Sequence, residues 1–511
     1  MKISFVCALL MAVSSALYAH KITNVACLFG HFKSVKVVSI EYTSQATVLT
    51  FKTTETCTPT LKIGGGIYIV DDNGQRHHAI GTESIKLDSL YVMVKGQTRK
   101  FSISFEPVDA NNKFIDVRSE QVRLHALYDA RDKPEVPVVE DSIDDEELHY
   151  LTSGVAGYVE VDGMFHGDGD VDGTVLYFDY DGFILNPLRW ADQYVKVDKD
   201  GHFKARFKID SPAVFPLRKG YRNIGEYLGM LYLRPGDKLH IEVRDCSDGM
   251  DITCTNLSGR KAYNRFANVS PSMLSANFYE YRKDFQSRLT YMGYDAHYAD
   301  LQECYKKDME FANYLCWHNG FTPFESRLCM NSMKEMYLGG FLSLDIYVGT
   351  LLSRARQDAE YARVTGKDND YEDVDTTYLK ALRDSMDYAY LKLLDPTDVS
   401  LMTDRTFKIT AGTINQLKPL AQCHDAVAKD DANRWMKIID LQRKELERFA
   451  GWTDMPFVMQ MMIVSDYLSV FDRKPADENQ YQQVRALLTN LYCKQYLDGM
   501  HKDRLEKASA K

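Results

Sequence analysis

The chain has 511 residues, of which 45% are hydrophobic and 26% are charged. That composition is typical of globular proteins, and the length suggests about three or four domains of ~100–200 residues each. The formal net charge is −10 at pH 7. Nucleic-acid binding needs a concentrated basic surface, so this balance argues against nucleic acid as a partner.

Residues 1–19 have the pattern of a secretory signal peptide, with Lys2 at a basic start, an apolar stretch and a small-residue end at Ala19. We therefore expect export to the periplasm or the outer cell envelope. Downstream, the longer apolar stretches are interrupted, as Asp345 interrupts 341–352. A bilayer-crossing helix needs ~20 apolar residues, so we expect no transmembrane span in the mature chain.

Residues 20–130 have the two-residue period of β-strands. Phe101, Ile103 and Phe105 alternate with polar residues, which indicates a strand with one buried face. The Asp-Asp-Asn-Gly segment at 71–74 favours a tight hairpin turn, because Asn-Gly tolerates positive φ. Short strands separated by turns predict a β-sandwich-like domain.

Residues 131–150 contain two prolines and eight acidic residues. This composition predicts a solvated acidic linker. At the other end of the chain, residues 501–511 are polar and lysine-rich, and we expect a frayed tail there.

A second β-sandwich-like domain is predicted over 151–256. Phe203 and Phe207 alternate with the basic residues of 202–208, and the turn-forming Arg-Pro-Gly-Asp segment at 234–237 separates two further strand-like runs. A basic stripe of this kind could meet an acidic ligand. The alternative, the solvated face of an edge strand, is more common.

From 257 to 500 the apolar period becomes helical. One long amphipathic helix is predicted from Cys329, Met333, Met336, Gly340, Leu344, Tyr347 and Leu351, which follow i+3/i+4 spacing. Further helices are predicted at 378–394, 430–450, 455–471 and 477–497. The expected fold class is multi-domain α+β, with two β-sandwich-like modules followed by an all-α helical domain.

One acidic loop has the ligand spacing of a calcium site. Asp168, Asp170, Asp172 and Asp179 stand at positions 1, 3, 5 and 12, and Gly173 stands at position 6. An apolar residue at position 4 and a strand-like run after the glycine fit an acidic β-turn equally well. Calcium is the one metal or cofactor that the sequence suggests.

Of the ten cysteines, nine remain after signal-peptide removal, and no two have C-x-x-C spacing. A thioredoxin-type redox centre and a zinc ribbon are therefore not expected. Cys246 and Cys254 are the best candidates for a disulfide, because the residues after Cys246 favour a turn between two strands.

No catalytic motif is present: there is no G-x-S-x-G elbow, H-E-x-x-H, phosphate-binding loop or G-x-G-x-x-G. His297, His318 and His424 are isolated in the helical half, and lone histidines are usually structural. An enzyme is therefore not the expected class.

Several short segments resemble the part of TlpA-like envelope thioredoxin-family proteins that precedes their thioredoxin domain. They are Ile85–Asp88, Ser104–Pro107 with Phe114–Asp116, Tyr232–Asp237 and Tyr388–Pro396. The resemblance implies β modules and a helical segment in an exported protein. It supplies no catalytic residue, because the chain has no W-C-x-x-C and a C-terminal thioredoxin domain is not expected.

Three functional hypotheses follow. The first is an exported envelope protein of accessory or binding type, whose ligand is a protein, peptide or glycan. The second is an enzyme whose site is assembled by the fold and is not readable from the sequence. The third is a thiol–disulfide helper that acts with a separate thioredoxin through an unpaired cysteine.

Overall fold

The computed structural model describes most of the chain after residue 19. The described residues are 20–30, 35–54, 60–92, 97–119, 123–153, 156–178, 194–209, 211–220, 225–246, 249–268, 294–365, 376–384, 388–403, 414–428, 431, 433–471 and 478–509. The predicted signal peptide lies outside them. The chain forms two compact units, the first comprising Met1–Val139, Arg244–Asp251 and Asn313–Gly320, and the second comprising Glu140–Val243, Ile252–Ala312 and Phe321–Lys511.

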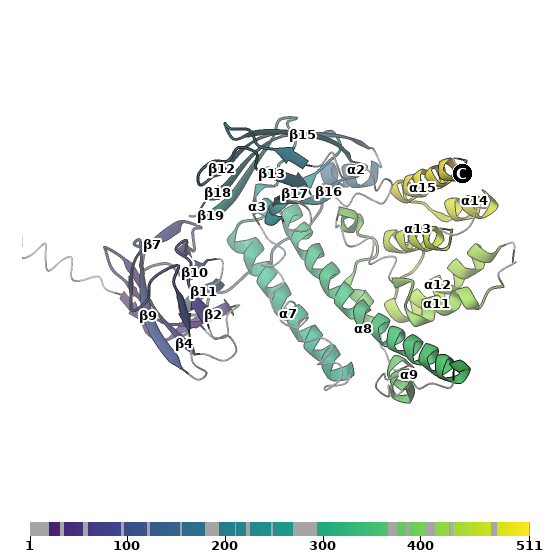
Figure 1. Ribbon diagram of the computed structural model, residues 1–511, viewed down its shortest axis with the longest axis horizontal. Helices are drawn as coiled ribbons and strands as arrows, with labels where there is room; N and C mark the ends of the chain where they lie inside the picture. The colour runs from purple at the N-terminus through teal and green to yellow at the C-terminus, as the bar shows by residue number, and fades with distance from the viewer. Residues whose placement is uncertain are drawn as a thin grey trace, which may run out of the picture. The chain divides into compact units, whose positions relative to one another are not determined.

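The first unit is a β structure built around one nine-stranded antiparallel sheet, drawn in purple and blue in Figure 1. Its strand order is β1-β3-β4-β9-β7-β6-β10-β11-β2. The bounds are β1 His20–Ile22, β2 Val25–Gly30, β3 Val35–Tyr42, β4 Thr47–Thr54, β6 Tyr68–Asp71, β7 Arg76–Glu83, β9 Thr98–Phe105, β10 Ile115–Arg118 and β11 Arg123–Asp129. A separate two-stranded sheet joins β5 Thr60–Lys62 to β8 Leu90–Val92.

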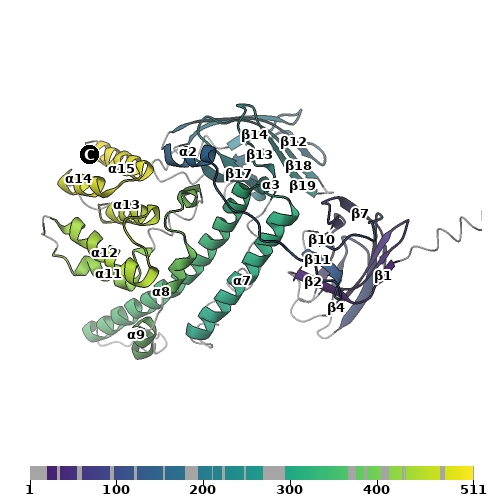
Figure 2. The same ribbon diagram turned by 180° about the vertical axis from the view of Figure 1, so that it is seen from behind.

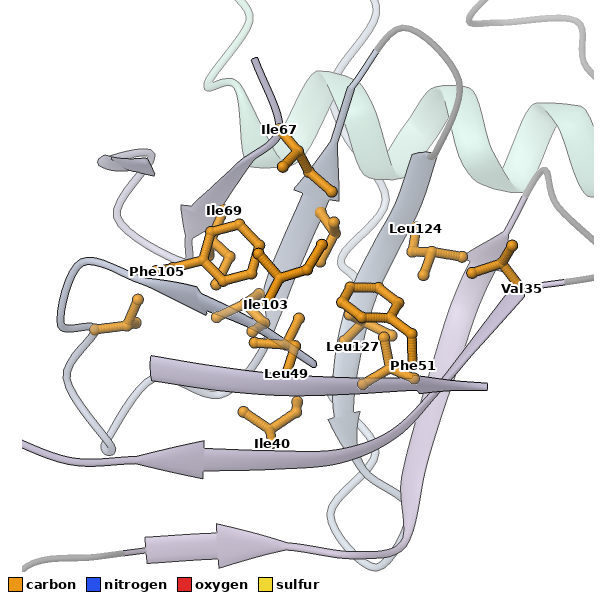
Figure 3. Close-up of a cluster of buried hydrophobic side chains, with 14 of the residues drawn as sticks. Val35, Ile40, Leu49, Phe51, Ile67, Ile69, Ile103, Phe105, Leu124 and Leu127 are labelled. Atoms are coloured by element: carbon orange, nitrogen blue, oxygen red, sulfur yellow. The ribbon is translucent and has the colours of Figure 1, made fainter. Parts of the chain in front are cut away.

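The nine-stranded sheet folds over on itself at β7, which makes it nearly closed. The first half of β7 pairs with β6 and its second half pairs with β9, with a register shift between Ala79 and Gly81. The two resulting layers enclose one apolar core. Figure 3 shows Phe51, Ile103 and Leu124 among its side chains. The predicted β-sandwich-like module is thus confirmed.

Two sequence patterns of this unit are confirmed in detail. Phe101, Ile103 and Phe105 of β9 are buried, as their alternation predicts. The predicted hairpin joins β6 to β7, and the N–H of Gly74 donates to the carbonyl of Asp71 (3.0 Å). Gly74 has φ +80°, the left-handed backbone that such a turn requires.

The second β module has two four-stranded antiparallel sheets, ordered β15-β12-β18-β19 and β14-β13-β16-β17. The bounds are β12 Gly157–Gly167, β13 Val175–Phe178, β14 Tyr194–Lys196, β15 His202–Ile209, β16 Ala213–Lys219, β17 Glu226–Leu233, β18 Lys238–Cys246 and β19 Gly249–Asn256. Phe207 of β15 packs against Phe178 and Phe215 of the other sheet, with ring centroids 5.4 and 5.6 Å apart. A sandwich is again confirmed.

The acidic segment before this module is only partly the solvated linker that its composition predicts. Helix α2, Asp145–Ser153, forms at its end, and the side chain of Glu147 is fully buried. The prediction of a linker up to residue 150 is wrong there, because Glu147 has buried partners in the second unit that the acidic composition does not reveal.

The described residues of the second unit that follow β19 are mainly helical, and α7 ends in the first unit, which includes Asn313–Gly320. The elements are α3 Asn264–Ala267, α7 Tyr294–His318, α8 Pro323–Thr365, α9 Thr376–Asp384, α11 Lys418–Asp425, α12 Arg434–Ala450, α13 Phe457–Phe471, α14 Glu478–Leu487, α15 Leu491–Ser509 and the 3₁₀ turns η2 Ala389–Leu393 and η3 Val399–Thr403. Figure 2 shows α7 beside α8. The hydroxyl of Tyr337 donates to Asp308 (2.6 Å), which ties the two helices together.

The long predicted helix is present as α8, and its buried stripe coincides with the predicted one only in part. Cys329, Met333 and Gly340 of the predicted stripe are buried. Met336, Tyr347 and Leu351 are only half-buried, whereas Tyr337, Phe341 and Val348 are buried. An ideal helix turns 3.6 residues per turn, so a stripe chosen by i+3/i+4 steps drifts around a helix of this length.

Three other predicted helical boundaries need correction. The predicted helix 378–394 is α9 followed by the 3₁₀ turn η2, and 477–497 is divided between α14 and α15. The predicted frayed tail from 501 continues α15 to Ser509. The reason is a tertiary contact, since His501 is buried and stacks on Tyr481 with centroids 3.8 Å apart.

One described helix segment, Pro323–Ser353 of α8, has the length and composition of a membrane-crossing helix, with a mean hydropathy of 1.3 over its most apolar window. Core helices of globular proteins meet the same criteria. Met333, Leu338 and Phe341 of this segment are buried within the protein. The absence of a membrane span from the mature chain stays a prediction.

Candidate functional site

The aspartates of the predicted calcium loop follow β12. Asp168 begins the loop, Gly169 has φ +93°, and the N–H of Asp172 donates to Oδ1 of Asp170 (3.0 Å). Asp179 lies outside the described residues. Within the part of the chain that the structure describes, no three His, Cys, Asp or Glu residues gather as a metal site would require. The described residues form an acidic turn, and calcium binding there stays a prediction.

The predicted disulfide between Cys246 and Cys254 is not formed in the structure. Cys246 ends β18 and β19 begins at Gly249, so the predicted hairpin is present. Residues at equal distances from a hairpin turn lie opposite each other. Cys254 is five residues into β19, about 17 Å along the strand at ~3.3 Å per residue, and therefore does not lie opposite Cys246.

Two buried thiols have environments that suppress their reactivity. Burial raises the pKa of Cys254 to about 12 and that of Cys423 to about 11. The thiolate is the nucleophile in thiol–disulfide exchange, so a raised pKa leaves little of the reactive form at neutral pH. These two residues do not favour the thiol–disulfide hypothesis.

The most concentrated polar constellation of the first unit surrounds Asp116 of β10. We call Asp116, Arg118, His125, Tyr314 and His318 the acid–histidine cluster. Nδ1 of His125 lies 2.9 Å from Oδ2 of Asp116, and Tyr314 donates its hydroxyl to Oδ1 (2.7 Å). Arg118 donates to Oδ2 (2.8 Å), and Nε2 of His318 lies 3.8 Å from that oxygen. Asp116 and His125 have no exposed side-chain surface.

Burial and charge oppose each other in this cluster. Burial by itself would raise the pKa of Asp116, but the charge of Arg118 and the hydrogen bond from His125 hold it well below its usual range. Burial lowers the pKa of His125 and of His318, although Asp116 opposes the shift. The carboxylate is thus held ionised while the histidines are held neutral.

The backbone beside the cluster is strained, and the strained residue donates a hydrogen bond to Asp116. Ala126 has φ +49°, in the left-handed region that residues with a Cβ rarely adopt. Its N–H donates to Oδ1 of Asp116 (2.8 Å). Both oxygens of Asp116 therefore accept hydrogen bonds from within the unit, and the carboxylate is placed to hold β10, β11 and the last turns of α7 together.

A second buried constellation, which we call the arginine–glutamate cluster, anchors α2 in the second unit. Glu147 accepts hydrogen bonds from the hydroxyls of Tyr232 (2.8 Å) and Tyr263 (2.7 Å) and from the guanidinium of Arg234. Arg234 also pairs with Asp237 (3.3 Å). Glu147 and Arg234 are essentially closed to solvent, so this cluster has the geometry of a structural clamp.

Among the helices, His424 pairs with Asp466, with Nε2 and Oδ2 2.7 Å apart. Trp435 packs its ring edge-on against His424, with centroids 5.8 Å apart, and Gln442 lies 3.4 Å from the same carboxylate oxygen. The histidine is therefore positioned by neighbouring helices, in agreement with the structural role expected of a lone histidine.

The basic stripe at 202–208 lies on β15, an edge strand, as the second of its two predicted interpretations requires. Lys204 pairs with Asp162 of β12 (2.9 Å) and Arg206 with Glu160 (3.5 Å). Arg206 also lies over the ring of Tyr158, 3.9 Å from its centroid. Two of its basic groups thus already have acidic partners on the next strand.

The outward face of the first unit carries a different basic arrangement. Lys36 of β3, Lys52 of β4 and Lys100 of β9 are exposed and occupy directly paired positions on three adjacent strands. We call these three residues the lysine row. Its central member, Lys52, has a lysine opposite it on each neighbouring strand. In the β15 stripe, by contrast, Lys204 and Arg206 lie beside acidic residues of β12.

The sequence contains parts of these clusters but does not show that they come together. Asp116 and the Tyr232–Asp237 segment lie in the segments that resemble TlpA-like proteins, and His318 is an isolated histidine in the sequence. The sequence signal that could have indicated a buried polar cluster is an ionisable residue between apolar neighbours, such as Asp116 between Ile115 and Val117, all three of which are buried. Its partners could not be read, because they lie far along the chain.

Comparison with known proteins gives little guidance. No protein family matches the chain, and no curated protein matches it. Among solved structures, the chain has a weak likeness to a "putative cell adhesion protein" from Bacteroides uniformis ATCC 8492, at 10% identity and a TM-score of 0.12. The match covers 39% of this chain and 93% of that one.

Proposed function

We propose that the chain is an exported, non-enzymatic protein of the cell envelope that binds a protein, peptide or glycan. The observation that carries this proposal is that the carboxylates of the two buried polar clusters already have hydrogen-bond partners within the protein. Both oxygens of Asp116 and both oxygens of Glu147 accept hydrogen bonds from neighbouring residues and are shielded from solvent. A catalytic acid or base needs access to its substrate, which these groups lack.

The location of the protein is proposed from the sequence. The signal-peptide pattern of residues 1–19 supports export, and the segments that resemble TlpA-like envelope proteins are consistent with an accessory role in the periplasm or outer envelope. Two sandwich modules are a suitable scaffold for binding, because each presents sheet faces on which exposed side chains are held in fixed register.

The test is whether the mature protein holds a ligand without changing it. The tagged mature chain is incubated with separated protein, peptide and glycan fractions of its native envelope, with thiols blocked throughout. We expect a specific ligand to be retained and to elute with unchanged mass. Recovery of a cleaved or otherwise altered ligand would favour the enzyme hypothesis instead.

A parallel capture with all nine cysteines of the mature chain replaced by serine distinguishes non-covalent ligand binding from thiol–disulfide exchange. Retention of the same ligand by the cysteine-free protein is expected. Loss of the ligand in that protein, with its circular dichroism unchanged, would point to a mixed disulfide and to the thiol–disulfide alternative.

A further inference from the structure

The lysine row is an unusual arrangement for a β-sheet surface. In the register of the sheet, Lys36 pairs with Lys52, and Lys52 pairs with Lys100 on its other side. Adjacent strands lie about 5 Å apart, so three like charges stand within about 10 Å. Like charges directly opposite each other destabilise a sheet, and at physiological salt that span is comparable with the Debye length.

We propose that the lysine row binds an anionic polysaccharide, a glycan whose carboxylate, phosphate or sulfate groups neutralise the three ammonium groups. The inference rests on the proposed binding function and gives that function a ligand chemistry. Charge complementarity is the main argument: the chain as a whole is acidic, with a net charge of −10, yet this face gathers three exposed cations in paired positions.

The neighbouring positions on the same face suit a sugar. One row further along the strands, Ser39 pairs with Thr50 and Thr50 with Ser102. The hydroxyls of Thr50 and Ser102 lie 3.2 Å apart. Hydroxyls both donate and accept hydrogen bonds, so they match the hydroxyls of a glycan as the lysines match its charged groups.

The described acids near the lysine row on this face leave it largely unopposed. Glu41, in the next outward row, is 2.7 Å from Lys21 and is thereby engaged. Glu83 of β7 pairs in register with Ser102, one strand away and two residues from Lys100. Neither acid occupies a position directly opposite a member of the lysine row.

The topology disfavours an acidic peptide that adds to the sheet as a strand. β4 is paired on one side with β3 and on the other with β9 over the length of the row. Strand addition needs a free edge, which the central strand of the row does not offer. A ligand that contacts all three lysines must therefore lie across the face and contact side chains. A row of only three cations is also a small footprint for nucleic acid.

Binding of defined polysaccharides to the mature full-length chain tests the proposal. The probes are polygalacturonate for carboxylates, dextran sulfate for sulfates, phosphomannan for phosphates and uncharged dextran as the neutral control, measured by titration calorimetry at several salt concentrations. We expect at least one anionic probe to bind and dextran not to bind. The anion whose polymer binds most tightly at equal charge density identifies the recognised group.

The decisive variant is K36Q/K52Q/K100Q, and its matched control is K204Q/R206Q/K208Q on the β15 stripe. We expect at least a tenfold loss of anionic-glycan affinity in the first variant only, with the log–log salt dependence reduced by about one for each contacting lysine removed. Its circular dichroism should be unchanged and its melting temperature equal or higher, since repulsion is removed. Equal affinity of wild type and K36Q/K52Q/K100Q, or an equal loss in the β15 control, would overturn the inference.

Failure of this inference is distinguishable from failure of the proposed function. If the wild-type chain binds no anionic probe but retains an unchanged envelope ligand, and K36Q/K52Q/K100Q retains it too, the lysine row is not the site and the binding function stands. If neither defined probes nor envelope fractions are retained by the wild-type chain, both the lysine-row site and the binding function are contradicted.

Discussion

Nδ1 of His125 lies 2.9 Å from Oδ2 of Asp116, and neither side chain has exposed surface. The two residues come from the paired strands β10 and β11, and the pair is completed by Tyr314 from the last turns of α7. A buried carboxylate is tolerated only when its charge is compensated and its oxygens are hydrogen-bonded. A single substitution in the acid–histidine cluster is therefore expected to destabilise the first unit.

Replacement of Asp116 by alanine should destabilise the first unit by about 3–5 kcal/mol, because Arg118, whose side chain is only 16% exposed, would lose its carboxylate acceptor. Hydrogen exchange measured by mass spectrometry on peptides of β10 and β11 reports the loss of stability locally. A local measurement is needed because the chain has two units, and a global one would not separate them. The control is Asp129→Asn, which removes an ion pair between Asp129 and the exposed Arg131. Similar loss of protection in both variants would argue against a special role for Asp116.

The same cluster predicts a pH dependence of stability. Burial depresses the folded-state pKa of His125 and His318, so each stays neutral in the fold while the unfolded chain binds a proton below about pH 6.5. Their contribution is fully present above that pH and is lost as the pH falls. Asp116, whose folded pKa is also depressed, adds a further loss below about pH 4.

The measurement is exchange protection of β10 and β11 between pH 7.5 and 5, corrected for the intrinsic pH dependence of exchange. We expect protection to decrease toward pH 5 in the wild type and the decrease to be smaller in His318→Gln. His78→Gln, in the same unit, should leave the profile unchanged. A wild-type profile that is flat over this range would contradict the assignment of neutral buried histidines.

In the second unit, Glu147→Ala should release α2, because Arg234, Tyr232 and Tyr263 all donate to the Glu147 carboxylate. Loss of one partner of a buried ion pair costs about 3–5 kcal/mol. Limited proteolysis within residues 140–153 is the readout, and cleavage there should accelerate markedly. Glu146→Ala, at the neighbouring and more exposed position, is the control, and equally fast cleavage in it would show that α2 is held by something else.

The contrast between these clusters and the rest of the fold shows what a sequence can reveal. The alternation of Phe101, Ile103 and Phe105 and the turn at Gly74 are set by neighbours within a few residues, and both were predicted correctly. Cores and hairpins of this kind depend on local period and turn chemistry. The α+β class and both sandwich modules follow from such signals.

The candidate sites depend on contacts that local patterns do not encode. Tyr314 is 198 residues from Asp116, and Arg234 is 87 residues from Glu147. An acidic composition predicts solvation for Glu147 unless its partners are known. The lysine row could not be predicted for the same reason, since Lys36 and Lys100 come together only through the strand order of the folded sheet.

The thiols give a further prediction. No disulfide joins Cys246 to Cys254 in the structure, so both should react with iodoacetamide after unfolding without a reductant. Peptide mapping by mass spectrometry is the measurement, and pre-reduced protein gives the reference for complete labelling. A disulfide-linked peptide pair containing Cys246 and Cys254 in the exported protein would restore the predicted bridge and require a different register between β18 and β19.

Two glycines of the helical part should respond in opposite directions to the same substitution. Gly451 ends α12 with φ +72°, and its N–H donates to the carbonyl of Glu447 (3.1 Å). Gly339 lies inside α8. A Cβ at either position would meet no atom within 4 Å, so the backbone alone decides the outcome.

Gly451→Ala should therefore cost about 1 kcal/mol, because alanine is strained in the left-handed region. Gly339→Ala should stabilise by up to about 1 kcal/mol, because alanine restricts the unfolded chain and favours the helix. Thermal unfolding followed by circular dichroism at 222 nm compares the two variants with the wild type. Stabilisation by Gly451→Ala would show that α12 does not end in the left-handed cap, and destabilisation by Gly339→Ala would show that α8 packs closely at that glycine.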